Sequence, residues 1–204
     1  MKATIFTIVT ALLFLSCNKA ADVIIDKALS PEHDTSNFIK YTIPQGSQYC
    51  DQNEFAAVET SEMKFIVRFD SSAIYQTVSA ENQNDINKLF GFSDNNSDHD
   101  KFSARFGWRW SDHALRLFAY VYNEAQMISK EITTVDIGKE INCSILVKDS
   151  HYVFTTNGRS TEMPRAATTE KGKGYQLYPY FGGDESAPHE IDIWIKSLDT
   201  SHAR

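Results

Sequence analysis

Hydrophobic and polar side chains alternate with a period of two through most of this sequence. In residues 62–70 every second side chain is hydrophobic, namely Met63, Phe65, Val67 and Phe69. Because successive side chains of a β-strand point to opposite faces, this pattern predicts a strand with one buried face. The same reasoning predicts further strands at residues 102–110, 114–122, 140–148, 151–156, 175–181 and 190–196.

Short polar segments separate the predicted strands. Asp149-Ser150 and Asn157-Gly158 are residue pairs typical of β-hairpin turns. Only residues 81–89 carry a weak helical pattern, and about ten strands are expected in all. Many short strands joined by tight turns predict an all-β fold, which we expect to be an antiparallel jelly-roll β-sandwich. A closed barrel is the alternative.

The N-terminal segment has a different character. Lys2 is followed by an apolar run over residues 5–15, a combination typical of a secretory signal peptide. The run is too short to cross a bilayer as a helix, which takes about 20 residues. The string Leu-Phe-Leu-Ser-Cys that ends at Cys17 resembles a bacterial lipobox, which implies removal of residues 1–16 and lipidation of Cys17. Asn18 then implies an outer-membrane location, on the periplasmic or the external side. A plain signal peptide, with Cys17 incidental, is the alternative.

The remaining chain is expected to hold one domain. Residues 17–37 have no clear period and are expected to form the lipidated N-terminus and a tether, which leaves residues 38–204 as a single β-sandwich. The chain has 204 residues and is 42% hydrophobic, enough to bury a core without metals or disulfides. Its 27 acidic and 20 basic side chains argue against a non-specific nucleic-acid binder, so no nucleic-acid partner is expected. Membrane contact is expected through the lipid anchor only.

Two cysteines lie within the expected domain, Cys50 and Cys143. The exported compartment permits a disulfide between them. The alternative is a pair of buried free thiols, because cysteine is often a small core residue. Cys143 alternates with Ile141 and Ile145, which indicates that it faces the core. Both alternatives stay open at this point.

Three strings carry a resemblance to a known group of proteins. They are KLFGFSD (residues 88–94), SARFGWRW (residues 103–110) and GKGYQLYPYFGGDESAPHEIDIWI (residues 172–195). Together they resemble a group of secreted bacterial lipoproteins with a concanavalin-A-like jelly roll, the lectin and glucanase fold. The resemblance covers residues 38–198 and implies the fold and export. By analogy of fold it also implies carbohydrate binding.

Arginine and aromatic side chains occupy the polar rows of several predicted strands. If those strands are neighbours, their rows form one surface on which aromatic rings stack against sugars and Arg binds hydroxyls or uronate carboxylates. The candidate ligand-binding residues are Arg105, Arg109, Arg116, Tyr120, Tyr122, Tyr178, Tyr180 and Trp194. The alternative is a second buried face covered by a loop. The main expectation is therefore non-catalytic binding of a glycan or another surface component.

One acidic stretch suggests a metal site. Its oxygen-bearing side chains recur at every second position, at Asp94, Asn96, Asp98 and Asp100, which resembles the first half of a calcium loop. The glycine and closing glutamate of an EF-hand are missing, so a solvated acidic loop is the alternative. His99 between two aspartates could instead favour a transition metal. No other cofactor is expected.

Catalysis is the second class of function. In jelly-roll polysaccharide lyases an Arg neutralises the uronate and a Tyr or His acts as base, which makes Arg105, Tyr180 and His189 the candidates here. The string YPYFGG resembles the lyase strand but lacks its Lys, and no Gln-x-His motif is present. A hydrolase would instead use Glu190 and Asp192, which share a face. His189 could equally hydrogen-bond a loop carbonyl. A structural or assembly lipoprotein with an unknown protein partner is the third class.

Overall fold

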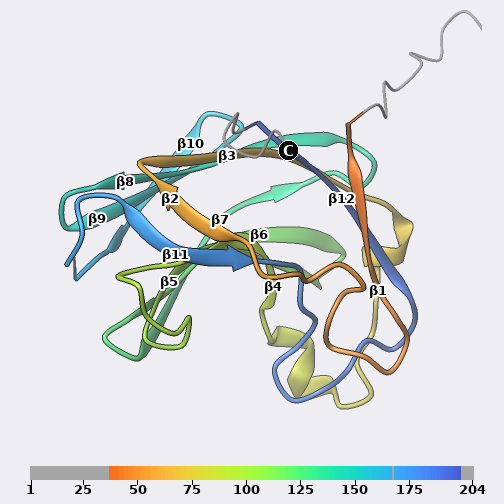
Figure 1. Cartoon of the computed structure of the whole chain (residues 1–204). Coiled ribbons are helices and arrows are strands. Elements are labelled where there is room, and N and C mark those ends of the chain that lie inside the picture. The colour runs from red at the N-terminus through yellow and green to blue at the C-terminus, as the bar shows by residue number, and fades with distance from the viewer. Residues whose placement is uncertain (1–36, 167, 199–204) are drawn as a thin grey trace, which may run out of the picture. The chain divides into compact units, whose positions relative to one another are not determined.

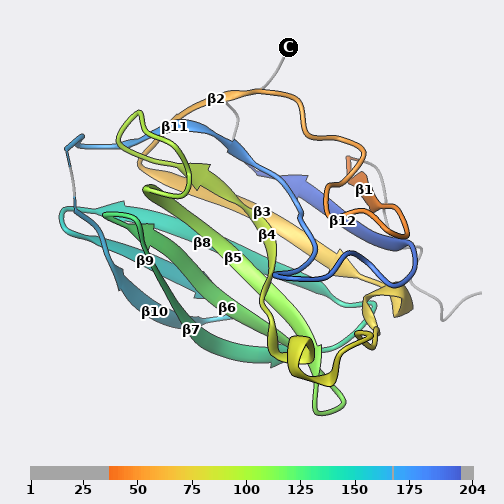
Figure 2. The ribbon, with the colours of Figure 1, turned by 90° about the horizontal axis from the view of Figure 1, so that it is seen from below.

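The computed structural model describes residues 37–166 and 168–198, which fold into two antiparallel six-stranded sheets (Figure 1). The first, called the β3 sheet, has the order β1 (Ile39–Ile43), β12 (Ile191–Ser197), β3 (Glu62–Phe69), β8 (Glu140–Lys148), β9 (His151–Thr156) and β10 (Arg159–Pro164). The second, called the β5 sheet, has the order β2 (Ala57–Thr60), β11 (Gly172–Leu177), β4 (Asn87–Ser93), β5 (Phe102–Ser111), β6 (Ala114–Asn123) and β7 (Gln126–Val135). The two sheets lie face to face (Figure 2), so the expected jelly-roll sandwich is confirmed and the closed barrel is wrong.

Aromatic side chains fill the space between the sheets. Phe65 and Phe69 of β3 are fully buried, and they pack against Phe106 and Trp108 of β5. The ring centroids of Phe65 and Phe106 lie 5.6 Å apart in an edge-to-face arrangement, and those of Phe69 and Trp108 lie 5.3 Å apart. These distances are in the range that aromatic pairs favour. The hydrophobic rows predicted for these strands therefore form the core.

The predicted elements differ from the structure in two places. The expected helix over residues 81–89 is wrong, because a short 3-10 turn (Ala80–Asn84) is followed by β4, which pairs with β5. The strand expected over residues 175–181 ends at Leu177, and Tyr180 makes only isolated bridges to Tyr49 and Lys88. The chain therefore becomes irregular after β11, where it borders the site described below.

The two cysteines are free and buried, so the disulfide alternative is wrong. The Cys50 thiol donates a hydrogen bond to the carbonyl oxygen of Gln52. The Cys143 sulfur lies 3.8 Å from the Thr156 hydroxyl. Burial raises the pKa of the Cys50 thiol to about 11 and that of Cys143 to about 12, so both stay protonated at neutral pH.

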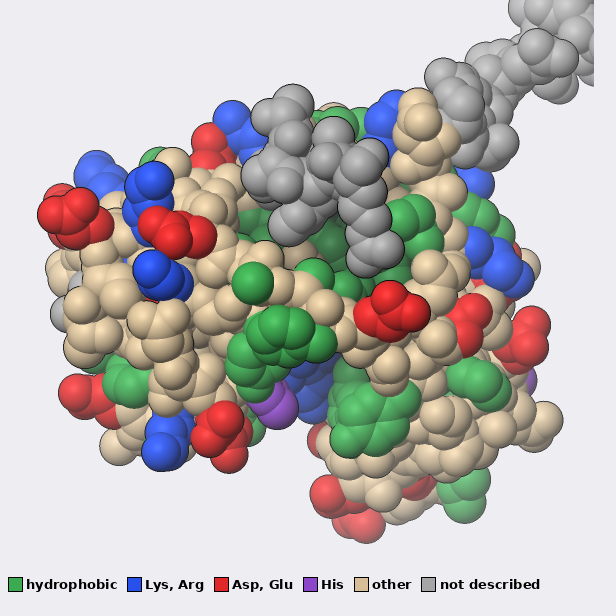
Figure 3. Space-filling model, in the orientation of Figure 1, with side chains coloured by type: hydrophobic (Ala, Val, Ile, Leu, Met, Phe, Trp, Pro, Cys, Tyr) green, Lys and Arg blue, Asp and Glu red, His purple; other side chains and the backbone are tan. Residues whose placement is uncertain are grey.

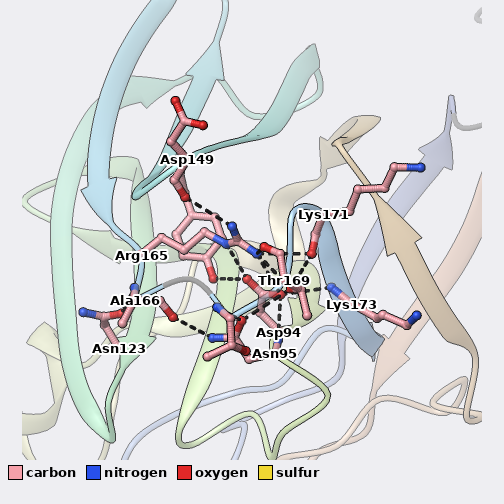
Figure 4. A network of polar contacts seen from close by, with 11 residues as sticks. Asp94, Asn95, Asn123, Asp149, Arg165, Ala166, Thr169, Lys171 and Lys173 are labelled. Atoms are coloured by element: carbon pink, nitrogen blue, oxygen red, sulfur yellow. Dashed lines mark hydrogen bonds and ion pairs between the residues drawn. The ribbon is translucent and has the colours of Figure 1, made fainter.

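The expected calcium loop is not formed, because Asp94 points into the protein. Its carboxylate is fully buried and accepts hydrogen bonds from the Tyr152 hydroxyl and the Arg165 guanidinium, at 2.5 and 2.7 Å (Figure 4). Asn96 and the two aspartates that follow it are exposed. Across residues 37–166 and 168–198, no group of three or more His, Cys, Asp or Glu side chains is placed to hold a metal ion.

The same aspartate joins the two sheets. Asp94 follows β4 of the β5 sheet, Tyr152 lies on β9 of the β3 sheet, and Arg165 follows β10. Arg165 also donates to the carbonyl oxygens of Thr169 and Lys171, which fixes the segment that leads into β11 (Figure 4). Burial opposes ionisation of Asp94, but the hydrogen bonds from Arg165 and Tyr152 outweigh it and hold the pKa of the carboxyl below its ordinary value.

The apolar N-terminal segment, Cys17 and the expected tether up to residue 36 lie outside the described residues. Signal cleavage, lipidation and an outer-membrane location therefore stay predictions from the sequence. The part of the chain that the structure describes has no helix long and apolar enough to cross a membrane.

Replacing Asp94 with Ala is expected to lower the free energy of unfolding by about 3–5 kcal/mol, because it leaves Arg165 buried without a counter-ion. Urea denaturation followed by tryptophan fluorescence measures this. The lowered pKa of Asp94 stabilises the folded chain above the unfolded value of about 3.9, and this stability is lost as the pH falls through the folded pKa. Glu59→Ala is the control, because Glu59 forms only an exposed ion pair with Lys173. Equal and small effects of the two variants would contradict the role given to Asp94.

Candidate functional site

A pocket of about 580 Å³ opens on the outer face of the β5 sheet. Its base comes from β4, β5 and β6, and its walls come from the loop before β2, the turn before β5 and residues 175–180. Figure 3 shows the hollow, with Lys or Arg and His side chains at its base and hydrophobic side chains on both sides. Several residues expected from the sequence to bind a ligand line this pocket, namely Arg105, Tyr122, Tyr178 and Tyr180.

Arg105 is buried at the base of the pocket, and none of the described carboxylates forms an ion pair with it. Its side chain projects from β5, and only 7% of the residue is exposed. No described residue accepts a hydrogen bond from its Nε, and its guanidinium lies 5.5 Å from the ring centroid of Tyr120. Burial lowers the pKa of Arg105 to about 10, while the phenol groups around it act in the opposite direction. A buried charge without a partner is costly, so an anionic ligand would relieve a deficit already present.

Gly91 makes room for this side chain. It lies directly opposite Arg105 in the β4–β5 pairing, next to a β-bulge that begins at Lys88. A Cβ at residue 91 would come within 2.4 Å of the Cβ of Arg105 and 2.1 Å of the backbone oxygen of Ala104. Contacts this short are forbidden, so the close approach of β4 and β5 requires glycine here.

Lys88 places a second cation beside Arg105. Its Nζ donates a 2.6 Å hydrogen bond to the carbonyl oxygen of Gly182 and lies 5.5 and 5.6 Å from the ring centroids of Tyr120 and Tyr180. Burial and then the positive charge of Arg105 lower the pKa of Lys88 to about 8, and Asp85 opposes this shift. A substantial fraction of Lys88 is therefore neutral in mildly alkaline solution.

Tyr180 and Tyr122 supply phenol groups to the pocket. Burial and then the neighbouring Tyr49 raise the pKa of Tyr180, and the charge of Arg105 opposes them. The Tyr180 hydroxyl therefore keeps its proton at neutral pH. Tyr120 is buried beneath the pocket, 6.0 Å from the ring of Tyr122, and it supports Arg105 and Lys88 from below.

Two exposed aromatic residues stand at the rim of the pocket. Tyr49 and Phe55 are 63% and 79% exposed, and both belong to the loop between β1 and β2. Tyr49 packs edge-on against Tyr180, with ring centroids 5.0 Å apart, and Phe55 lies 6.0 Å from Tyr175. This loop has no hydrophobic period, so the sequence pattern could not identify either residue as part of a site.

Two histidines were candidates for chemistry in the sequence, and only one borders the pocket. His99 lines it, and its Nδ1 is 3.1 Å from the Tyr175 hydroxyl. Burial and then the charge of Arg105 lower the pKa of His99, which favours the neutral imidazole. His189 does not line the pocket, and its Nε2 lies 2.8 Å from the carbonyl oxygen of Ser72. That position corresponds to the structural alternative considered for His189.

Three of the expected ligand-binding residues lie elsewhere. Arg109 donates to the carbonyl oxygen of Asn84, and Arg116 forms ion pairs with Glu131 and Asp112. Trp194 lies on β12 of the β3 sheet, with its ring 5.2 Å from the Arg68 guanidinium. The alternation along a strand identifies which residues share a face, but it does not say to which sheet the strand belongs.

The carboxylates considered for hydrolysis are also outside the pocket. Asp192 projects from β12 and binds the Lys40 ammonium and the Thr42 hydroxyl, at 3.0 and 2.7 Å. Glu190 immediately precedes the same strand. Glu54 and Asp100 are the acidic residues that line the pocket, and both are exposed, so they can accept hydrogen bonds from sugar hydroxyls.

The chain matches no protein-family description and no curated protein sequence. Its structure is similar to that of the alginate lyase AlyC3, with a TM-score of 0.54 and 9% identity over 81% of this chain and 77% of that chain. A GH16 protein from the mixed-linkage glucan locus of Bacteroides ovatus gives a TM-score of 0.52 and 8% identity over 79% and 81% of the two chains. A functionally unknown protein from Saccharomyces cerevisiae gives 0.50 and 12% over 79% and 85%. The chain therefore shares its jelly-roll fold with proteins that act on glycans.

Proposed function

We propose that the pocket binds a uronate-containing polysaccharide and cleaves it by β-elimination. The observation that carries this proposal is the buried guanidinium of Arg105, which has no counter-ion among residues 37–166 and 168–198 and lies beside Lys88 at the base of an aromatic-lined pocket. The fold shared with an alginate lyase supports the proposal. These findings favour the lyase alternative over the non-catalytic binding that the sequence led us to expect first.

The ligand is inferred from charge. A uronate carboxylate would accept charge-assisted hydrogen bonds from Arg105 and compensate its buried charge. A neutral glycan offers no such compensation. Hydrolysis is less well supported, because Glu190 and Asp192 lie outside the pocket.

We assign the roles in the reaction to side chains that line the pocket together, and the directions of their pKa shifts agree with the assignment. Arg105 neutralises the carboxylate, which acidifies the hydrogen on C5 of the uronate. Neutral Lys88 takes that proton, the C5–H electrons form the C4–C5 double bond, and the bond from C4 to the leaving oxygen breaks. Tyr180, whose raised pKa keeps its hydroxyl protonated, gives a proton to the leaving oxygen. Environments that push two pKa values apart in this way are typical of an acid–base pair.

The first test is cleavage. Incubation with alginate, pectate and glycosaminoglycans is expected to release an unsaturated uronate from at least one of them, measured by its ultraviolet absorbance. Arg105→Met is expected to lower kcat/KM by about 10- to 100-fold, because charged hydrogen bonds contribute about 1.5–3 kcal/mol. Arg109→Met is the matched control on the same strand, and its rate should stay unchanged. Binding of the acidic polymer without any product would leave only the non-catalytic alternative.

The second test is the pH dependence of the rate. In the unbound protein the pKa of Lys88 is about 8, so kcat/KM is expected to rise about tenfold per pH unit below 8 and to level off above it. Lys88→Arg keeps the charge but stays protonated, so it is expected to lose about 100-fold or more. A rate that falls as the pH rises through 8, with activity retained in Lys88→Arg, would show that Lys88 acts as a cation and would exclude its role as base.

The third test separates binding from folding. Arg105→Met is expected to raise the free energy of unfolding by about 1 kcal/mol and Tm by about 2–4 °C, because it removes an unpaired buried charge. Differential scanning calorimetry of both proteins measures the shift. A large loss of stability in the variant would mean that Arg105 serves the fold.

A further inference from the structure

The rim of the pocket carries two aromatic side chains that the reaction does not use. We propose that Tyr49 and Phe55 stack on the sugar rings that flank the reacting uronate, so that the site takes an internal stretch of at least three consecutive sugars. This inference rests on the proposed function, because it assumes that the central sugar is held at Arg105.

The two rings lie at opposite ends of one wall. Tyr49 packs against Tyr180 and Phe55 packs against Tyr175, and residues 175–180 line the pocket. Tyr175 and Tyr180 are five residues apart along the chain, so their Cα atoms lie at most about 18 Å from each other. Arg105 lines the same pocket as both tyrosines. Figure 3 agrees, with hydrophobic side chains on both sides of the hollow and basic side chains at its base.

The backbone beside Tyr49 is held in place by hydrogen bonds to residues far along the chain. The Phe181 amide donates to the carbonyl oxygen of Gln48, and the Ala187 amide donates to that of Ser47, at 2.8 and 2.9 Å. The Tyr49 amide itself donates to the Ser47 hydroxyl. Because this backbone is already fixed, sugar binding orders little more than one side chain.

The backbone beside Phe55 is anchored to β11. The Gln176 amide donates a 2.8 Å hydrogen bond to the carbonyl oxygen of Ala56, and the Gln176 side chain donates to the carbonyl oxygen of Gly91. Phe55 thereby stays beside the ring of Tyr175 while most of its own surface is open to solvent.

Single exposed hydrophobic residues are common and need no explanation. These two differ because they line the same pocket and each packs against a tyrosine that lines it too. Flat aromatic faces match the apolar C–H surfaces of sugar rings, and rigid aromatic side chains supply contact area at low entropic cost. Both rings are therefore suited to hold the sugars next to the one that reacts.

The test uses oligouronates of defined length, from the disaccharide to the hexasaccharide, of the polymer that the full chain cleaves. For the unaltered protein kcat/KM is expected to increase with the length of the oligouronate, up to the length at which sugars lie against both Tyr49 and Phe55. Tyr49→Ala and Phe55→Ala are each expected to lower kcat/KM on the longer oligouronates by about 2- to 10-fold relative to the shortest cleavable one. The size follows because an aromatic contact contributes about 0.5–1.5 kcal/mol. Cleavage of the shortest cleavable substrate should stay unchanged in Phe55→Ala. Tyr49→Ala is judged by its dependence on length alone, because Tyr49 also packs against Tyr180 and its loss can change the rate at every length.

Tyr49→Phe and Phe55→Tyr are the matched controls, because they keep the ring and should keep the dependence on length. Both alanine sites are exposed, and an unchanged Tm confirms that the fold is retained. An unchanged length dependence in both alanine variants, or an equal loss at every length, would overturn the stacking role while cleavage that depends on Arg105 stands. If the unaltered chain neither binds nor cleaves any oligouronate, the proposed function fails and the stacking role fails with it.

Discussion

Arg105 is a charged side chain buried on the β5 sheet, and no carboxylate in the described part of the chain pairs with it. The site depends on how the fold keeps this side chain in place. Gly91 leaves the space that the side chain needs, Tyr120 supports it from below, and Lys88 adds a second positive charge. These neighbours position the guanidinium without neutralising it. A buried charge of this kind is stabilised by a group of opposite charge that enters the pocket, so an anion is its natural ligand.

A comparison with the other buried arginine makes this clear. Arg165 is as deeply buried, but Asp94 pairs with it at 2.7 Å and three carbonyl oxygens accept its remaining protons. That network joins the two sheets and fixes the start of β11, whose later residues form a wall of the pocket. The charge of Arg165 is therefore compensated, and its contacts connect the two sheets. The charge of Arg105 has no described partner and lies at the base of a pocket that opens to solvent.

Much of the fold follows from alternation along the chain, because local pattern decides which side chains share a face. Arg105 and Tyr120 were placed on polar rows from the sequence, and the pairing of β5 with β6 sets them opposite each other. The local pattern could not predict which strands and side chains distant in the sequence come together. Nothing local shows that Trp194 belongs to the other sheet, or that Asp94 meets Arg165, 71 residues away.

The remaining site residues were missed for related reasons. Lys88 is the single charged residue of β4, and a bulge next to it interrupts the simple alternation. Tyr49 and Phe55 belong to a loop without a period, and hydrogen bonds to residues more than 100 positions later determine where they lie. A lysine directly before the buried run of residues 89–92 was a signal in the sequence that could have indicated the second cation.

A crystal structure of the full chain soaked with an oligouronate of the cleaved polymer tests the central claim most directly. The carboxylate of one sugar is expected within hydrogen-bond distance of Arg105 Nε, with Lys88 and Tyr180 on either side of the C4–C5 bond. An oligosaccharide bound elsewhere, or bound in this pocket with its carboxylates directed to solvent, would contradict the claim that the uncompensated charge of Arg105 selects the substrate.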